Sequence, residues 1–356
     1  MWPRSDLTEL LGIEHPIIQA PMAGSATPAL AAAVSNAGGL GSLGCGSMSL
    51  ADLKASNDSL RAATNRPFNL NFFAHEAPEA DPEVDARARE RVTPFYQELG
   101  LGAVPDSAEA PFGTFDDERL ALLLEIKPAV VSFHFGLPEP DKVAALQQAG
   151  SRIVCTATTV AEAQALEAAG VDAIIAQGWE AGGHRGSHAI TYEEDGIGLM
   201  ALVPQVVDAV GVPVIAAGGL ADGRGIAAAF ALGASGVQMG SAFLTCPEAS
   251  LKAAHRSALE TASDQDTRFT RAFSGRPARA RSNRYIEGMA RQREPLPAFP
   301  RMYGFSEPLR SKAAADGSPD FEFLLYGQAA ALNRALPAAE LVQTLIREAQ
   351  EIMGTR

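Results

Sequence analysis

Cysteine is scarce in this sequence of 356 residues, which argues against a disulfide-rich or metal-stabilised protein. Cys45, Cys155 and Cys246 lie far apart, form no Cys-x-x-Cys pair and show no cysteine and histidine spacing typical of zinc ligands. We therefore expect no metal site and three reduced, packed cysteines in a cytoplasmic protein.

Positive charge is also in short supply, with 29 Lys and Arg against 42 Asp and Glu, a formal net charge of -13. A field of this sign attracts neither nucleic acid nor an anionic membrane. The first residues, MWPRSDLTELLG, lack the apolar core of a signal peptide, and no apolar run is long enough to span a bilayer. We expect no nucleic-acid or membrane partner, and a homo-oligomer remains possible.

Two common nucleotide motifs are missing as well. No Gly-x-Gly-x-x-Gly follows the first apolar segment, and no Walker loop occurs, so a tightly held dinucleotide or nucleoside triphosphate is not indicated. Hydrophobic residues nevertheless make up 47% of the chain, enough for a large core.

Short apolar segments alternate regularly with helical patterns along most of the chain. This alternation predicts a parallel sheet with right-handed crossovers, and eight such units predict a closed (β/α)8 TIM barrel. The expected strands are 16–22, 40–44, 68–73, 129–135, 152–157, 173–178, 213–217 and 236–241, and the expected helices are 27–36, 51–63, 84–99, 116–126, 141–149, 160–169, 200–210, 224–232 and 337–353.

Two stretches interrupt the alternation. Residues 75–114 are rich in proline and charge and predict an insertion within a barrel that spans residues 1–245. Residues 246–310 predict an added lobe over the C-terminal face of the barrel, and residues 311–356 predict C-terminal helices that close onto it.

Residues 173–187, AIIAQGWEAGGHRGS, carry a buried strand, a glycine turn and one histidine in succession. Gly182 and Gly183 let the backbone approach a ligand closely, and His184 follows where the chain leaves the barrel rim. A single histidine in a loop is more often an ordinary exposed residue, so a catalytic role for His184 needs support from the rest of the chain.

Glycines also end the last two predicted strands, where barrels of this class commonly bind phosphate. They occur in Gly218-Gly219 and in Met239-Gly240-Ser241, and the helix that begins after Asp222 is expected to direct its positive end toward the same anion. Tight turns use glycine for their own reasons, but two glycine-bearing ends on adjacent strands favour a phosphate site.

Amide side chains end three other strands. Gln19, Asn71 and Gln177 can donate to and accept from the edge of a heteroaromatic ring, and Pro21-Met22 leaves backbone groups free beside it. A flat cofactor with polar edges and a phosphate tail would suit such a pocket.

Taken together, eight segments resemble the nitronate monooxygenase family, formerly called 2-nitropropane dioxygenases, and most resemble its first class. The likeness runs in order over residues 13–245 and resumes at 320–328. The segments are PIIQAPMAG with AVSNAGGLGSLG, NLNFF, VSFHFGLP, DAIIAQGWEAGGHRG, PVIAAGGLADGRG, GVQMGSAFL and DFEFLLYGQ.

The resemblance implies an FMN-dependent barrel that oxidises alkyl nitronates with O2 to a carbonyl compound and nitrite, without consuming NAD(P)H. Propionate 3-nitronate and neutral nitroalkanes are candidate substrates. His184 matches the histidine beside the flavin and the substrate nitro group. The positions that match FMN-binding residues are Met22, Asn71, Gln177, Gly182, Gly219, Gln238, Met239, Gly240 and Ser241, with Gly219 and the last four at the phosphate.

The capping segment departs from the first class. Only Tyr303 matches the expected tyrosine pair, and Glu307 stands where a lysine is usual. His134 and His75 lie near strand ends and either face the substrate or serve as ordinary core or loop residues.

Two other functions remain open. An FMN-dependent NAD(P)H reductase acting on quinones or enoyl thioesters would need nearly the same ring and phosphate contacts. A barrel that binds a phosphorylated metabolite, as a lyase, an isomerase or a sensor, would contain no flavin.

Overall fold

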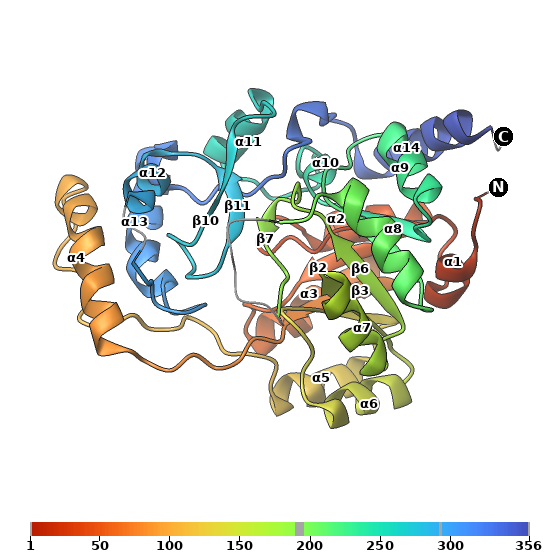
Figure 1. The fold of residues 1–356 in the computed structure, drawn as a ribbon, viewed down its shortest axis with the longest axis horizontal. Coiled ribbons are helices and arrows are strands. Elements are labelled where there is room, and N and C mark those ends of the chain that lie inside the picture. Colours follow the sequence, from red (N-terminus) through yellow and green to blue (C-terminus); the bar gives the residue numbers. More distant parts are fainter. Residues whose placement is uncertain (1, 189–195, 292–293, 355–356) are drawn as a thin grey trace.

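Eight parallel strands form the centre of the computed structural model, which describes residues 2–188, 196–291 and 294–354 (Figure 1). Their order is β1-β9-β8-β6-β5-β4-β3-β2, and a bridge between Ile18 and Leu40 joins the two edges into a nearly closed barrel. The predicted TIM barrel and its eight strands are confirmed. The strands are β1 (Ile17–Gln19), β2 (Gly41–Gly44), β3 (Phe68–Phe73), β4 (Val130–His134), β5 (Arg152–Ala157), β6 (Ala173–Gln177), β8 (Val214–Ala217) and β9 (Gly236–Met239).

Neighbouring residues of each strand face opposite sides of the barrel wall, as the period of a strand requires. Ile174 packs outward with the helices, whereas Ile175 packs into the barrel interior with Ile215. The short helix α1 (Asp6–Leu11) adds Leu7 and Leu11 to that interior cluster, and so supplies apolar side chains beyond those of the strands.

Helices cover the outside of the barrel (Figure 1). Small residues bring them close, since a Cβ on Gly41 would lie 1.9 Å from the carbonyl oxygen of Ala31. Threonine, serine or aspartate caps several of them, as at Thr159 and Asp222. The barrel helices are α2 (Pro28–Asn36), α3 (Leu50–Ala63), α5 (Asp117–Ile126), α6 (Pro140–Gln148), α7 (Val160–Ala168), α8 (Leu199–Ala209), α9 (Gly223–Ala231) and α10 (Ser241–Leu244), with α14 (Ala338–Met353) packed on α9 and α2.

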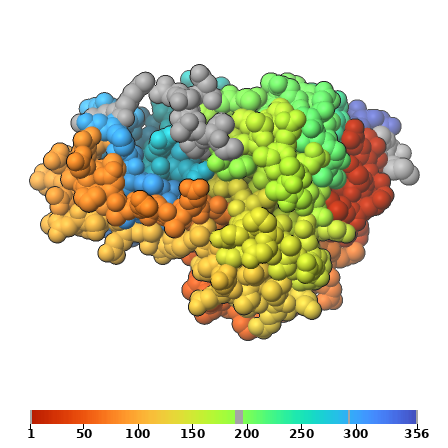
Figure 2. Space-filling view, turned by 60° about the horizontal axis from the view of Figure 1, so that its bottom comes forward, coloured from red at the N-terminus to blue at the C-terminus, as the bar shows by residue number. Residues whose placement is uncertain are grey.

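A second hydrophobic cluster lies beside the barrel and draws on two distant parts of the chain (Figures 1 and 2). Val92 and Tyr96 of α4 pack with Tyr285 and Phe305, so residues 75–114 share a core with the segment after residue 246. The proposed domain division at residues 245 and 310 stays a prediction. The helices of this cluster are α4 (Pro82–Glu98), α12 (Arg284–Ala290), α13 (Tyr303–Asp316) and the 3-10 helix η1 (Pro319–Phe321). A smaller cluster packs α11 (Ala253–Glu260) and the 3-10 helix η2 (Ala330–Leu332) against Leu244 of α10.

A small antiparallel sheet joins this second cluster to the barrel, and the sequence did not predict it. β7 (Gly183–His184) pairs with β11 (Ala278–Arg281), which pairs with β10 (Thr267–Thr270). His184 therefore lies on a strand and not in a free loop. No helix among the described residues is both long and apolar enough to cross a membrane.

Candidate active site

A cavity of about 610 Å³ opens at the carboxyl ends of the barrel strands. Parallel strands gather their ends at this face, which is where barrel enzymes carry their reactive groups. The structure brings together every site residue proposed from the family resemblance, and of the two histidines proposed from their place near strand ends it adds His134 but not His75. The cavity is lined by Met22, Asn71, His134, Gln177, Gly182, His184, Gly219, Gln238, Met239, Gly240, Ser241 and Tyr303.

A hydrogen bond to Ser274 engages Nε2 of the His184 ring. The Ser274 hydroxyl has one hydrogen and donates it to the carbonyl oxygen of Arg276 at 3.0 Å. In this arrangement Ser274 accepts the 2.9 Å hydrogen bond from Nε2 of His184. In the neutral ring this leaves Nδ1 as an unprotonated acceptor on a side chain that lines the cavity.

The ring of His184 is neutral at physiological pH. Burial lowers its pKa to about 3, and the neighbouring His134, Arg276 and Arg310 act in the same direction. The burial is largely aromatic, with ring centroids at 5.4 Å from His184 for Phe299 and 5.8 Å for Phe135. An anion placed in the cavity would favour the protonated ring and raise this pKa again.

The backbone of His184 is held by two side chains from the barrel. Its carbonyl oxygen accepts a hydrogen bond from Nε2 of Gln177 at 3.0 Å and one from Nε2 of His134 at 3.1 Å. Nδ1 of His134 then accepts from the Thr156 hydroxyl at 3.1 Å. Burial lowers the pKa of His134 to about 4, so this arrangement with a neutral ring persists at physiological pH.

The Gln177 side chain uses both its donor and its acceptor for hydrogen bonds within the protein. Besides the bond to His184, its Oε1 accepts from the backbone N–H of Gly186 at 2.8 Å. The proposed role of Gln19 in a ligand pocket is wrong. Its side chain is fully buried, accepts from the N–H of Ser42 at 2.9 Å, donates to the carbonyl oxygen of Ala20, and does not line the cavity.

Phe135 adopts a backbone conformation that is uncommon for a residue with a side chain. Its φ of 74° lies in the left-handed region, next to Gly136. This turn places the Phe135 ring under the guanidinium of Arg276 at 4.0 Å and 5.8 Å from the ring of His184. Backbone strain of this kind persists where the surrounding structure enforces it, often at functional sites.

His75 lies away from the cavity lining. Its ring packs against Phe299 at 4.9 Å and Phe112 at 6.5 Å, and burial lowers its pKa to about 4. Neither ring nitrogen has a hydrogen-bond partner among the described residues. This environment suits a neutral core histidine.

Glycines form one wall of the cavity and leave room for a ligand. A Cβ on Gly182 would lie 2.4 Å from the backbone nitrogen of Gly327, so only glycine fits where these two segments cross. The Ser241 hydroxyl oxygen accepts from that same N–H of Gly327 at 2.9 Å. Its hydrogen and the nearby backbone N–H groups remain candidates for an anion.

The expected contribution of the helix after Asp222 to an anion site is not found. The Asp222 carboxylate accepts from the N–H groups of Arg224 at 2.9 Å and Gly225 at 3.4 Å. The N–H of Gly223 donates to Glu348 at 3.1 Å. The protein itself thus uses the first donors of α9, and neither Asp222 nor Gly223 lines the cavity.

Two amides of the cavity have acceptor capacity to spare, as a flat cofactor with N–H donors would require. Nδ2 of Asn71 donates to the hydroxyl and the carbonyl oxygen of Ser132 at 2.9 and 3.2 Å, which turns its Oδ1 into the free acceptor. Oε1 of Gln238 is buried without a hydrogen-bond partner in the described ranges. The residues present therefore fit a heteroaromatic ring.

One face of α13 closes the other side of the cavity. Tyr303, Glu307 and Arg310 lie four and three residues apart, which places them on one side of a helix, and all three line the cavity. Glu307 and Arg310 form an ion pair at 2.7 Å, and the guanidinium lies 5.5 Å from the centre of the Tyr303 ring. The cation at this wall is therefore Arg310.

Several residues around His184 come from the segment after residue 246 and were missed by the sequence analysis. Ser274 and Phe299 carry no recognisable motif, and only the folded chain brings them to the ring. Arg310 could have been found, because the spacing from Tyr303 and Glu307 predicts a shared helical face.

A barrel with a cavity at the carboxyl ends of its strands and the neutral, hydrogen-bonded imidazole of His184 in its wall defines a barrel enzyme of the TIM class. The profile of the nitronate monooxygenase family matches residues 4–348. The chain belongs to this family.

Individual relatives agree with that assignment. The nitronate monooxygenase of Pseudomonas aeruginosa is 47% identical over 344 residues, 96% of this chain and 98% of the relative. That of Paraburkholderia phytofirmans is 47% identical over 348 residues, 97% of this chain and 95% of the relative. Among solved structures, nitroalkane oxidase from Streptomyces ansochromogenes is similar with a TM-score of 0.89 and 40% identity, covering 98% of this chain and 99% of that one.

Proposed function

We propose that this enzyme binds FMN and oxidises alkyl nitronates with O2 to a carbonyl compound and nitrite, without consuming NAD(P)H. The observation that carries the proposal is the placement of the neutral imidazole of His184, whose Nε2 is engaged by Ser274, in the same cavity as a glycine-lined wall. The substrate is a small anion, and the described cavity supplies His184 and Arg310 to receive it.

FMN would be held by groups that the protein leaves available. Oδ1 of Asn71 would accept from the ring edge, and so would the unpartnered Oε1 of Gln238, a position that the family resemblance instead places at the phosphate. The backbone of Gly219, Gly240 and Ser241 would bind the phosphate. The redox chemistry between substrate and O2 would be supplied by bound FMN.

His184 would manage the proton. As the neutral ring it can take a proton at Nδ1 from the carbon next to a nitro group, which would convert a nitroalkane into a nitronate. With a nitronate bound, the same nitrogen can hold a proton and donate it to the anionic oxygens. The aromatic rings around His184 keep water away and strengthen this hydrogen bond.

An anaerobic titration tests this function. We expect the purified protein to carry a flavin spectrum that alkyl nitronate bleaches and NADH does not, followed by nitrite release when O2 is admitted. Rapid bleaching by NADH alone would instead identify a reductase. A colourless protein that gains no flavin spectrum on addition of FMN would favour a barrel that binds a phosphorylated metabolite and no flavin.

Substituting valine for Gly240 is expected to weaken FMN binding without unfolding the chain. The Cβ would contact Ala20 at 3.5 Å and Met22 at 3.8 Å, which are ordinary distances, so the added methyl groups extend into the wall that would hold the phosphate. The FMN-to-protein ratio and a fluorescence titration measure the effect. Gly102→Val, at an exposed glycine with no atom within 4 Å, is the control, and equal FMN content in both variants would show that the phosphate lies elsewhere.

Ser274→Ala is expected to reduce kcat/KM for nitronate about tenfold. Losing the hydrogen-bond partner of Nε2 costs about 1–3 kcal/mol and frees the His184 ring to move. Ser274→Thr retains a hydroxyl and should recover part of the activity. Ser306→Ala is the control, since Ser306 is equally buried but donates to the carbonyl oxygen of Phe273 at 2.6 Å and makes no contact with His184 that the structure records. Equal rates in the two alanine variants would remove Ser274 from the mechanism.

A further inference from the structure

The chain that carries His184 continues into residues 185–188, and each of these four residues forms a hydrogen bond with the barrel. The Arg185 guanidinium donates to the carbonyl oxygen of Gln177 at 2.7 Å, and the N–H of Gly186 donates to the Gln177 side chain. The hydroxyls of Ser187 and Thr158 are 2.6 Å apart. We call residues 185–188 the histidine-anchoring segment.

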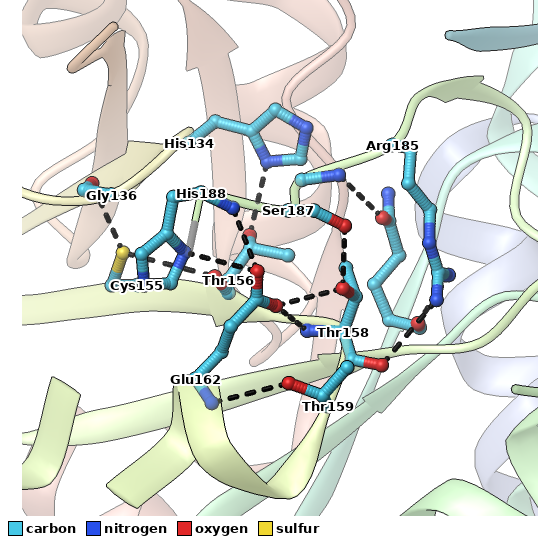
Figure 3. Close-up of polar contacts among 12 residues, drawn as sticks. His134, Gly136, Cys155, Thr156, Thr158, Thr159, Glu162, Arg185, Ser187 and His188 are labelled. Atoms are coloured by element: carbon cyan, nitrogen blue, oxygen red, sulfur yellow. Dashed lines mark hydrogen bonds and ion pairs between the residues drawn. The ribbon is translucent and has the colours of Figure 1, made fainter. Parts of the chain in front are cut away.

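The far end of this segment rests on a buried carboxylate, Glu162 of α7 (Figure 3). Its side chain is fully buried. Oε1 accepts from the N–H of His188 at 2.7 Å, and Oε2 accepts from both the N–H and the hydroxyl of Thr158, each at 2.7 Å. Glu162 is not among the residues that line the cavity.

The carboxylate also sets the direction of the neighbouring hydroxyls. Since Thr158 gives its only hydroxyl hydrogen to Glu162, Ser187 must donate its own hydrogen to Thr158. A chain of hydrogen bonds thus runs from the histidine-anchoring segment through Thr158 to Glu162. Three donors and the N-terminal turn of α7 compensate for burying the charge.

We propose that Glu162 is a positioning residue for the reaction, one that fixes the His184 ring by anchoring the segment that follows it. The inference rests on the proposed function, in which His184 contacts the substrate. Both carboxylate oxygens accept from backbone N–H groups, which cannot change into acceptors. No group other than a carboxylate of this length satisfies both, so the anchor depends on the acid itself.

Glu162→Gln gives a direct test. Whichever way the amide turns, its NH2 faces a backbone N–H, and the segment must shift. We expect kcat/KM for nitronate to fall about tenfold to a hundredfold, because small misplacements of a reacting group have effects of this size. FMN content should remain that of the wild type.

Glu167→Gln is the matched control on the same helix. Glu167 also accepts from backbone N–H groups, those of Gly211 at 2.6 Å and Val212 at 3.2 Å, but these belong to the turn before β8 and not to the segment after His184. This variant loses the same charge and should retain wild-type kcat/KM. Equal activity losses in Glu162→Gln and Glu167→Gln would overturn the proposal.

A double-mutant cycle separates positioning from general damage. If Glu162 acts through His184, Glu162→Gln should cause no further loss in a His184→Asn background, whereas independent effects would multiply. Ser187→Ala removes one hydrogen bond of the same chain and should cause a smaller loss of kcat/KM. That loss should also be absent in the His184→Asn background. Should Glu162→Gln fail to fold, this second variant decides the question, and multiplicative losses would refute the proposal.

Hydrogen exchange supplies a reading that needs no turnover. Backbone amides of residues 184–188 should exchange faster in Glu162→Gln than in the wild type. Their exchange rates should be the same in Glu167→Gln as in the wild type. Unchanged exchange in both variants would overturn the anchoring role even if nitronate is the substrate. Faster exchange in Glu162→Gln alone, in a protein that proves inactive on nitronate, would keep the anchor and reject the proposed function.

Discussion

Replacing His184 with asparagine should leave FMN bound while kcat/KM for alkyl nitronate falls by about 10²- to 10⁴-fold, the range that a positioned acid or base contributes. Asparagine fits the space of the ring and can still meet the Ser274 hydroxyl, but it has no nitrogen that takes up a proton. The backbone of residue 184, which Gln177 and His134 hold, is unaffected by the substitution.

The flavin spectrum and steady-state kinetics measure the two halves of this result. His15→Asn is the matched control, because His15 accepts from the indole of Trp2 at 3.1 Å and lies outside the cavity lining. Wild-type turnover in His184→Asn would exclude the imidazole from the chemistry. Loss of FMN from that variant would instead make His184 part of the cofactor site.

The barrel could be predicted from the sequence because each of its units is a local pattern. A short apolar run such as residues 173–177 is buried on both faces by helices, so its composition alone identifies a strand of a parallel sheet. The strand ends then follow from topology, since parallel strands expose their carboxyl ends at one rim. That geometry explains why Asn71, His184 and Gly240 line one cavity although they are far apart in the sequence.

The surroundings of His184 could not be predicted in the same way. β7 has two residues and becomes a strand only by pairing with β11, almost a hundred positions later. Ser274 and Phe299 reach the ring through that pairing and through the shared cluster of α4 with α12 and α13. No periodicity in the sequence signals such long-range contacts, and the low pKa of His184 follows from them.

The roles of the side-chain amides also could not be predicted from the sequence. Gln19, Asn71 and Gln177 look alike in sequence, each near the end of a strand. In the structure Gln19 is consumed by backbone groups inside the barrel, and Gln177 holds the His184 strand. Asn71 alone of the three has an acceptor to spare, because Ser132 takes its donors. The residue type thus gave the hydrogen-bonding capacity but not its use.

Acidification between pH 6.5 and about 4 should strongly destabilise the folded protein. Burial lowers the pKa of every histidine in the chain, to about 4 for His75, His134 and His255 and to about 3 for His184. The unfolded chain binds these protons below its ordinary histidine pKa of about 6.5, whereas the folded chain does not. The free energy of unfolding therefore falls as the pH drops through this window, and the loss is absent above about pH 7.

The size of the effect follows from the number of protons taken up on unfolding. His75 and His255 are 5% and 8% exposed, and each should contribute a slope of about 1.4 kcal/mol per pH unit near pH 5. Urea unfolding at a series of pH values measures the slope. His75→Phe, which keeps a ring beside Phe112 and Phe299, should reduce it by one proton. A free energy of unfolding that does not change between pH 7 and pH 5 would contradict this prediction. It would mean that the histidine rings are solvated in the folded protein, including the ring of His184 on which the proposed chemistry depends.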